Sequence, residues 1–230
     1  MRLRLSLAAC TLLTAISAAV PQPARAGFDA AEARAVAAAI NRDRRLTHML
    51  RQCPADVFGK RRPKASATRA SAGSQASCEA RPGACFRACV QAADGEACFR
   101  LAQTFQSHED VIRPLHAETL FTLACASGEG SGCTNRGAGI RNGDYAGDPF
   151  KRKPEHVQES CQYRSFKIAC DEDDAWGCAM LGQSYQYGEG TRGNPALARA
   201  AYEKSCRLAP DFEACEFIRP RLETLRKGQD

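Results

Sequence analysis

The spacing of the cysteines is the feature of this sequence that most restricts its fold. The 230-residue chain contains 13 cysteines, and eight of them form four pairs whose members are eight or nine residues apart. The first members of successive pairs are 36, 45 and 36 residues apart. A period of this length is typical of repeat proteins, in which each unit packs on its neighbours. The pairs are Cys89 with Cys98, Cys125 with Cys133, Cys170 with Cys178 and Cys206 with Cys215.

Other residues keep a constant offset from these cysteines. An aromatic residue stands four positions before the first cysteine, a small residue four positions after the second, and a larger apolar residue seven positions after the second. Offsets of four and seven lie on one face of a helix. The pattern therefore predicts helix–loop–helix units in which the small residue of the first helix (A) lets the aromatic residue of the second helix (B) approach closely. The residues are Phe121, Phe166 and Tyr202; Ala102, Gly137 and Gly182; and Phe105, Ile140, Tyr185 and Leu222.

These units predict an all-α fold, an α-solenoid of disulfide-stapled helix–loop–helix repeats over residues 78–230. The copies span about 95–127, 130–171 and 174–209, and a capping helix follows at 212–227. In the third copy, Gly188 and Gly190 break the chain between the two helices, and Pro195 suits the first turn of the second helix.

The third copy also resembles a known repeat. The segment GCAMLGQSYQYGEGTRGNPALARAAYEKSC (Gly177 to Cys206) is similar to a Sel-one-like repeat, a relative of the tetratricopeptide repeat. The cysteine pairs at the junctions between units resemble those of the Helicobacter cysteine-rich protein family. The second copy has nine extra residues in its A–B loop, and the first lacks the glycines. The resemblance implies a helical repeat fold and brings an association with penicillin binding and weak β-lactamase activity.

The eight paired cysteines are expected to form structural disulfides in the order given above. Each pair spans a turn between antiparallel helices, where the Cα atoms can come within the 4.4–6.8 Å that a disulfide requires. Zinc sites usually have two to four residues between ligands, whereas seven or eight separate these cysteines. The sequence contains no C-x-x-C redox motif and no C-x-x-C-H haem motif.

Four further cysteines, Cys53, Cys78, Cys85 and Cys161, allow three pairings. Cys78 and Cys85 flank the turn-forming segment EARPGA and are candidates for a disulfide with each other. Cys53 would then pair with Cys161, or both would stay free. The sequence leaves this pairing open.

The N-terminus predicts export. Residues 1–26 have two early arginines, an apolar run and an Ala24-Arg25-Ala26 cleavage site, which together are typical of a bacterial signal peptide. The expected location is therefore the periplasm or the exterior, with no transmembrane segment in the mature chain. The alternative is a lipoprotein signal with lipidation of Cys10, because Leu7-Ala8-Ala9-Cys10 has the composition of a lipobox. Cleavage near Ala26 leaves 12 cysteines, an even number that suits an oxidising compartment.

The region between the signal and the repeats divides into two parts. Residues 27–53 are expected to form an N-terminal helix, and residues 54–77, rich in Lys, Arg, Ala and Ser, a flexible basic linker. Residues 27–77 contain 10 basic and 4 acidic residues, and residues 78–230 contain 19 and 22. A nucleic-acid binder would place positive charge on its folded face, so no nucleic-acid partner is expected. The insertion of the second copy supplies a candidate recognition loop with Tyr145, Phe150, Lys151, Arg152 and Lys153.

No catalytic, metal or cofactor site is expected. The four histidines, His48, His108, His116 and His156, are scattered, and the sequence lacks H-E-x-x-H, G-x-S-x-G, S-x-x-K and K-T-G motifs. The first hypothesis is therefore a scaffold that binds a protein or peptide partner. The alternative, carried by the resemblance alone, is a β-lactam-binding protein or weak β-lactamase, which a chromogenic cephalosporin would detect. A haem or metal chaperone has cysteine and histidine content in its favour but no ligand spacing.

Overall fold

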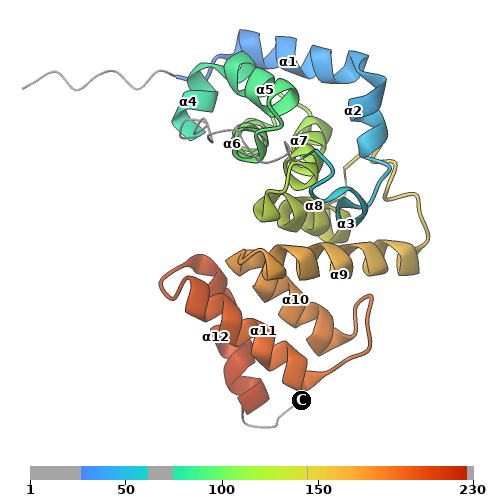
Figure 1. Cartoon of the computed structure of the whole chain (residues 1–230), viewed down its shortest axis with the longest axis vertical. Coiled ribbons are helices and arrows are strands. Elements are labelled where there is room, and N and C mark those ends of the chain that lie inside the picture. Colours follow the sequence, from blue (N-terminus) through green and yellow to red (C-terminus); the bar gives the residue numbers. More distant parts are fainter. Residues whose placement is uncertain (1–26, 62–74, 144, 227–230) are drawn as a thin grey trace, which may run out of the picture.

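The computed structural model describes residues 27–61, 75–143 and 145–226, and this part of the chain folds into twelve α-helices. The predicted all-α class is confirmed. The helices follow one another down the long axis of the molecule, from α1 and α5 at one end to α12 at the other (Figure 1). They are α1 (Ala30–Arg42), α2 (Arg44–Met49), α3 (Pro54–Val57), α4 (Gln75–Ala80), α5 (Pro82–Gln91), α6 (Gly95–Gln106), α7 (Pro114–Ala126), α8 (Gly130–Asn142), α9 (Glu155–Asp171), α10 (Ala175–Tyr187), α11 (Pro195–Leu208) and α12 (Glu213–Arg226).

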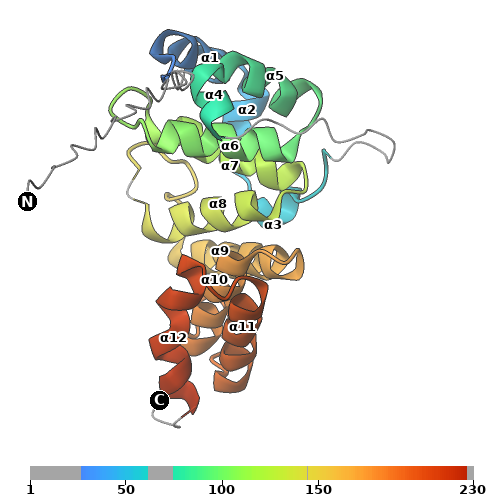
Figure 2. The same ribbon diagram turned by 90° about the vertical axis from the view of Figure 1, so that its left-hand side faces the viewer.

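The helices form disulfide-linked pairs. The A helices are α6, α8, α10 and α12, and the B helices are α5, α7, α9 and α11. A disulfide joins the end of each B helix to the start of the next A helix, and the successive pairs lie in layers along the axis (Figure 2).

The eight cysteines at these junctions are bonded in the order that their spacing predicts. The Cα–Cα distances of the four bonds are 4.7, 4.7, 4.4 and 4.7 Å, and the second cysteine of every bond is buried in the first turn of its A helix. The bonds are Cys89–Cys98, Cys125–Cys133, Cys170–Cys178 and Cys206–Cys215. Cys178 thus fixes the start of α10 to α9, and Cys215 fixes the start of α12 to α11.

The turn is built in the same way at three of the four junctions, before α6, α8 and α10. An acidic residue four positions before the second cysteine caps the A helix: Asp94, Glu129 and Asp174 accept hydrogen bonds from backbone N–H groups of α6, α8 and α10. Such caps satisfy donors that a helix start would otherwise leave free. The backbone N–H of each acid donates to the carbonyl of the small residue that precedes the first cysteine, namely Ala88, Ala124 and Ala169, at 3.2, 2.9 and 3.0 Å.

The close approach of A and B helices has the predicted cause. A Cβ atom added to Gly137 would lie 2.8 Å from Cε1 of Phe166, and one added to Gly182 would lie 2.3 Å from the ring of Tyr202. Both rings are fully buried. Glycine therefore makes room for the aromatic side chain in the second and third copies.

Gly182→Ala is expected to lower the free energy of unfolding by about 1–3 kcal/mol, the usual cost of overpacking a core. Alanine normally favours a helix over glycine by about 1 kcal/mol, so the sign of the effect reports the Tyr202 contact. Urea denaturation under non-reducing conditions measures it. Gly193→Ala is the control, because its added Cβ would have its nearest neighbour, Tyr185 O, at 3.8 Å. Equal stability of Gly182→Ala and the native protein would contradict this explanation.

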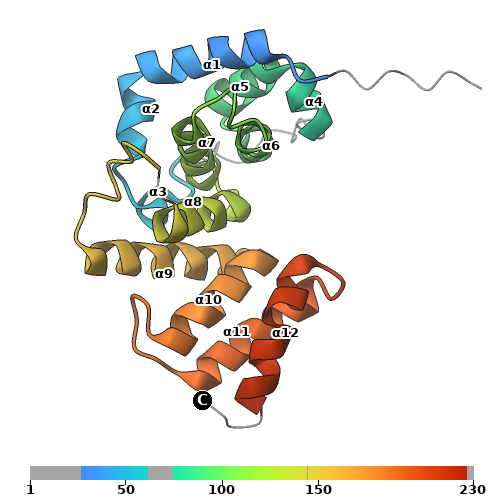
Figure 3. The ribbon, with the colours of Figure 1, turned by 180° about the vertical axis from the view of Figure 1, so that it is seen from behind.

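The segment before the repeats is an arm that lies along the B helices. α1 packs on α5, α2 on α7, and α3 on α7, α8 and α9, so the arm runs down one side of the molecule (Figure 3). Its end is joined to α9 by the disulfide Cys53–Cys161. The arm thus connects units that are distant in sequence.

The arm differs from the single N-terminal helix expected over 27–53. The helix is interrupted at Asp43, whose backbone is extended and whose side chain caps α2 by accepting from the N–H of Arg45. The segment expected to start a linker also differs, since residues 54–57 form α3 and the backbone N–H groups of Gly59 and Arg61 donate to carbonyls at the end of α7. Residues 62–74 of that linker lie outside the described residues, and its last residues, 75–77, belong to α4 and not to a linker.

The apolar core is divided along the axis. One large cluster joins the arm to α4–α7, and another joins α9–α12. Two small clusters lie between them, one around Cys53 and Cys161 and one around Cys125 and Cys133. The apolar core between the two large clusters therefore consists largely of two disulfides and the few residues around them.

Six disulfides are typical of an oxidising compartment. None of the described helices has the length and apolar character needed to cross a bilayer. The predicted signal peptide and Cys10 lie outside the described residues.

Candidate functional site

The candidate recognition loop between α8 and α9 is folded onto the core. Phe150 is only 1% exposed and belongs to the small cluster with Cys53, Ile140 and Cys161. Lys153 covers it, with Nζ 4.3 Å from the ring centroid. Phe150 is therefore a core residue that anchors the insertion, and it is not on the surface where a partner could contact it.

The other loop candidates are placed differently from one another. Lys151 donates from Nζ to the carbonyl of Ile140 at 2.7 Å and so ties the loop to the end of α8. Tyr145 is half-buried, and Arg152 is exposed. The structure does not bring these five residues together as one binding surface.

A buried ion cluster holds the same loop. The guanidinium of Arg136 on α8 is fully buried. It donates to Glu118 on α7 at 2.7 Å and to both carboxylate oxygens of Asp148 in the loop at 2.6 and 3.0 Å. Its Nη2 also donates to the carbonyl of Leu50 at 3.2 Å. One side chain thus joins α7, α8, the loop and the arm.

Two carboxylates share this one guanidinium, and burial decides how one of them, Glu118, titrates. Removal from water raises the pKa of Glu118 to about 7, although Arg136 acts in the opposite direction, and the negative charge of Asp148 raises it further. Burial and Glu118 also raise the pKa of the neighbouring Tyr145. Glu118 therefore holds a proton in the folded state over a pH range where the unfolded chain has lost it.

This proton predicts a pH-dependent stability. Between about pH 4.5 and 7 Glu118 is more protonated in the folded state than in the unfolded state, so its contribution to stability falls as pH rises through this range and levels off above it. A shift of this size corresponds to about 3 kcal/mol. Glu118→Gln is expected to flatten the dependence, measured by urea denaturation at pH 5 and pH 7.5. The exposed Glu223→Gln should keep the native slope, and an unchanged slope in Glu118→Gln would contradict the prediction.

A groove on the A helices is the strongest candidate for a binding site. It is a depression of about 490 Å³ between α8, α10 and α12, which we call the A-helix groove. Its size is in the range of small-molecule and side-chain pockets. It is lined by Thr134, Asn135, Ala138, Arg141, Asn142, Trp176, Met180, Gln183 and Phe217.

One wall of the groove is aromatic. Trp176 at the start of α10 packs against Phe217 of α12, with ring centroids 5.4 Å apart, and edge-on against Phe212 at 6.4 Å. Phe212 and Phe217 remain 45% and 37% exposed. Arg221 lies over the Phe217 ring at 4.3 Å. Exposed aromatic rings beside a cation are typical of the energetically dominant parts of protein interfaces.

Two disulfides hold the helices that carry this wall. Trp176 stands two residues before Cys178, and Phe217 stands two residues after Cys215. Cys178 is bonded to Cys170 and Cys215 to Cys206, so the first turns of α10 and α12 are both fastened to the B helices behind them. The two rings therefore lie next to covalent anchors.

The opposite wall is polar and partly held in place. Arg141 donates to Gln183 and to Glu189, in the latter case at 2.7 Å. Asn135 donates to the carbonyl of Ser131 at 2.8 Å. Asn142 is exposed at the end of α8. The amide groups of this wall can both donate and accept hydrogen bonds.

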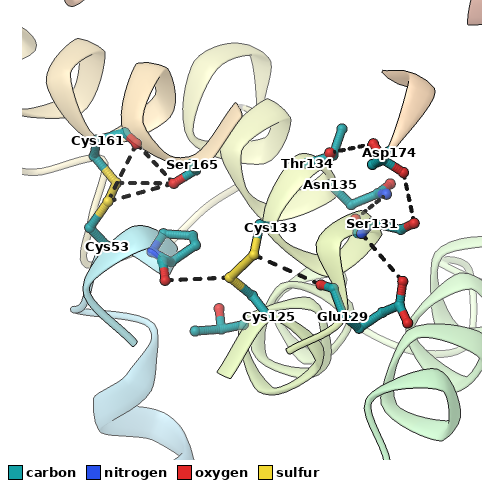
Figure 4. Close-up of a disulfide and its surroundings, with 12 residues drawn as sticks. Cys53, Cys125, Glu129, Ser131, Cys133, Thr134, Asn135, Cys161, Ser165 and Asp174 are labelled. Carbon is teal, nitrogen blue, oxygen red and sulfur yellow. Dashed lines mark hydrogen bonds between the residues drawn. A yellow bond between two sulfur atoms is a disulfide. The ribbon is translucent and has the colours of Figure 1, made fainter. Parts of the chain in front are cut away.

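The two walls are held together by Asp174, the cap of α10. Its carboxylate accepts from Ser131 at 2.8 Å and from Thr134 at 2.6 Å (Figure 4). It also accepts from the N–H of Gly177 at 2.6 Å. Cys133, which is bonded to Cys125 of α7, stands between Ser131 and Thr134 in the first turns of α8. The hydrogen bonds from Ser131 and Thr134 to Asp174 fix α8 relative to α10, the two helices that form most of the groove.

The remaining cysteines form two more disulfides. Cys53 is bonded to Cys161 and Cys78 to Cys85, both with Cα atoms 5.6 Å apart. The second bond joins α4 to α5. All twelve cysteines of the described residues are therefore in disulfides.

The histidines lie in four separate places. His116 is buried and its ring nitrogens bond to the Arg113 carbonyl and to Asn41, while His108 stacks on Phe28 at 3.8 Å. His48 and His156 are exposed. In the described part of the chain, no three His, Cys, Asp or Glu side chains are grouped so that they could hold a metal ion.

The groove residues were not singled out from the sequence, although a signal exists. Asn135, Met180 and Phe217 each stand two positions after the second cysteine of their unit, and Gln183 stands five after. The same register that identifies the core positions therefore also identifies the groove positions.

Comparisons with protein-family models, with curated proteins and with solved structures found no match for this chain.

Proposed function

We propose that the protein is a periplasmic or secreted binding scaffold, a disulfide-stapled α-solenoid of Sel-one-like type, which holds an extended segment of a partner protein in the A-helix groove. The observation that carries the proposal is the meeting of an aromatic wall and an amide-bearing wall on adjacent A helices. The signal-like N-terminus and six disulfides support an exported protein.

The chemistry of the groove favours a peptide. An extended peptide has unpaired N–H and C=O groups along its backbone, and Asn135, Asn142 and Gln183 offer partners of both kinds. Trp176 and Phe217 offer a flat apolar surface for one anchoring side chain. The disulfides keep the helices in place before binding, which reduces the entropy lost on association.

Selection from a library of random twelve-residue peptides tests the proposal, with the oxidised protein as bait. Selected peptides should have an apolar or aromatic anchor, and fluorescence anisotropy should show saturable binding. Trp176→Ala and Asn135→Ala with Asn142→Ala should each weaken binding at least tenfold, because each removes one wall.

The matched control is Gln106→Ala, which removes an exposed amide on α6 outside the groove. It should leave binding unchanged. The proposal would be overturned if no peptides were selected, or if the selected peptides bound both groove variants as tightly as the native protein. Far-ultraviolet circular dichroism of each variant verifies that the helices are intact.

A further inference from the structure

A larger cavity lies between the arm and the B helices. It has a volume of about 660 Å³ and shares no residue with the A-helix groove. Its floor includes Leu46 of α2 with Leu123 and Ala126 of α7, all three buried. Pockets of 300–1,000 Å³ with apolar floors are typical of small-molecule sites.

The rim of this cavity is cationic. Arg44, Arg45, Lys60 and Arg61 line it, and Asp43 is the single acid among the described residues that do so. The Asp43 carboxylate already caps α2 by accepting from the N–H of Arg45 at 2.8 Å, and it lies 3.5 Å from the Arg45 guanidinium. The positive charge of the rim is therefore largely uncompensated, which attracts an anion.

Arg61 is held by hydrogen bonds at the wall of this cavity. Its backbone N–H donates to Ala126 at 2.8 Å, and its Nη2 donates to the carbonyl of Val90 at 2.8 Å. These bonds hold the side chain in place. Its Nη1 is buried and has no hydrogen-bond partner among the described residues. Desolvation and repulsion from Arg45 lower the pKa of Arg61, and an anion bound at this wall of the cavity would offset both effects.

We propose that this cavity binds a small single-chain anionic amphiphile, with its carboxylate on Arg61 and its apolar chain over Leu46 and Leu123. The lining offers cationic donors, whereas its side-chain acceptors are Asp43, Gln52 and His48, the first already engaged. A peptide would bring N–H groups that need acceptors, and a carboxylate on a hydrocarbon chain brings none. Residues 62–74, which follow Arg61, carry three cations and no acid. Their charge has the same sign as that of the rim, so this segment is not the expected occupant of the cavity.

Isothermal titration calorimetry of the intact oxidised protein with dodecanoate tests the proposal. Dodecanoate is kept below its critical micelle concentration. We expect saturable binding of one molecule per chain that weakens as salt is added. Arg61→Met should weaken it at least tenfold. Arg207→Met is the matched control, because it removes one exposed cation on α11 and gives the same net charge. It should leave the affinity unchanged.

Three results would overturn the proposal. These are equal binding of dodecyltrimethylammonium, an unchanged affinity in Arg61→Met, and association with phosphatidylglycerol vesicles without binding of free dodecanoate. A dodecanoate with a photoreactive diazirine at its chain end locates the site in the unaltered protein, so the test stands even if Arg61→Met fails to fold. Cross-links should fall on α2, Val57 or the end of α7, and cross-links confined to other parts of the chain would also reject the site. Loss of this site would leave peptide binding in the A-helix groove unaffected.

Discussion

Replacing Cys53 and Cys161 together by serine is expected to lower the free energy of unfolding by about 4–5 kcal/mol, more than the loss of any other disulfide. This bond closes a loop of 108 residues, and the chain-entropy relation increases with the logarithm of loop length. The same relation yields about 2.6 kcal/mol for a nine-residue loop such as that between Cys89 and Cys98. Cys53 and Cys161 also belong to one of the two small clusters between the large ones, together with Ile140 and Phe150.

Urea denaturation of the two double-serine variants under non-reducing conditions measures the difference. Cys89→Ser with Cys98→Ser is the matched control, since it removes the same atoms from a short loop. Hydrogen exchange should also show loss of protection in α1–α3 only for the Cys53/Cys161 variant, because only that bond fastens the arm to α9. Equal destabilisation of the two variants would show that loop length does not govern the effect.

Arg136→Met is expected to lower the free energy of unfolding by about 3–5 kcal/mol, the usual cost of breaking a buried ion pair by removing one partner. Methionine keeps most of the volume but leaves Glu118 and Asp148 buried without their shared guanidinium. α8 is a weak helix on its own, with four glycines among 13 residues. The loop that Asp148 and Phe150 anchor should become susceptible to proteolysis at the same time.

Thermal and urea denaturation measure the loss, and limited proteolysis locates it. Arg152→Met is the control, because it removes an exposed cation from the same loop. It should change stability by less than about 0.5 kcal/mol. A triple variant that also carries Glu118→Gln and Asp148→Asn should regain part of the stability, because no buried charge remains. A loss below 1 kcal/mol in Arg136→Met would contradict a stabilising role for the cluster.

The repeated helix pairs were predictable because their determinants are local. Gly182, Tyr202 and the paired cysteines lie within one unit, so their spacing can be recognised in a short stretch of sequence. The acidic caps were not singled out from the sequence, although Asp94, Glu129 and Asp174 all stand four residues before the second cysteine. They belong to the same local pattern as the cysteines.

The arm and the loop were not predictable in this way, because their partners are distant in sequence. Asp148 reads as a surface charge until Arg136 and Glu118 are seen to enclose it, and Phe150 reads as a recognition residue until it packs beside Cys53. Likewise, the cavity beside Arg61 exists only because the arm returns along the B helices. Contacts between such distant residues leave no periodic pattern in the sequence from which they could be predicted.

The sequence by itself determined the helical class, the period of the units and the contacts between small and aromatic residues, because helix geometry converts fixed offsets directly into shared faces. Only the tertiary structure decided which charges are buried, how the arm is attached and where the two cavities lie. These properties depend on residues 12 to 108 positions apart. Burial, not residue type, determines whether a charged or aromatic side chain belongs to the core or to a binding surface.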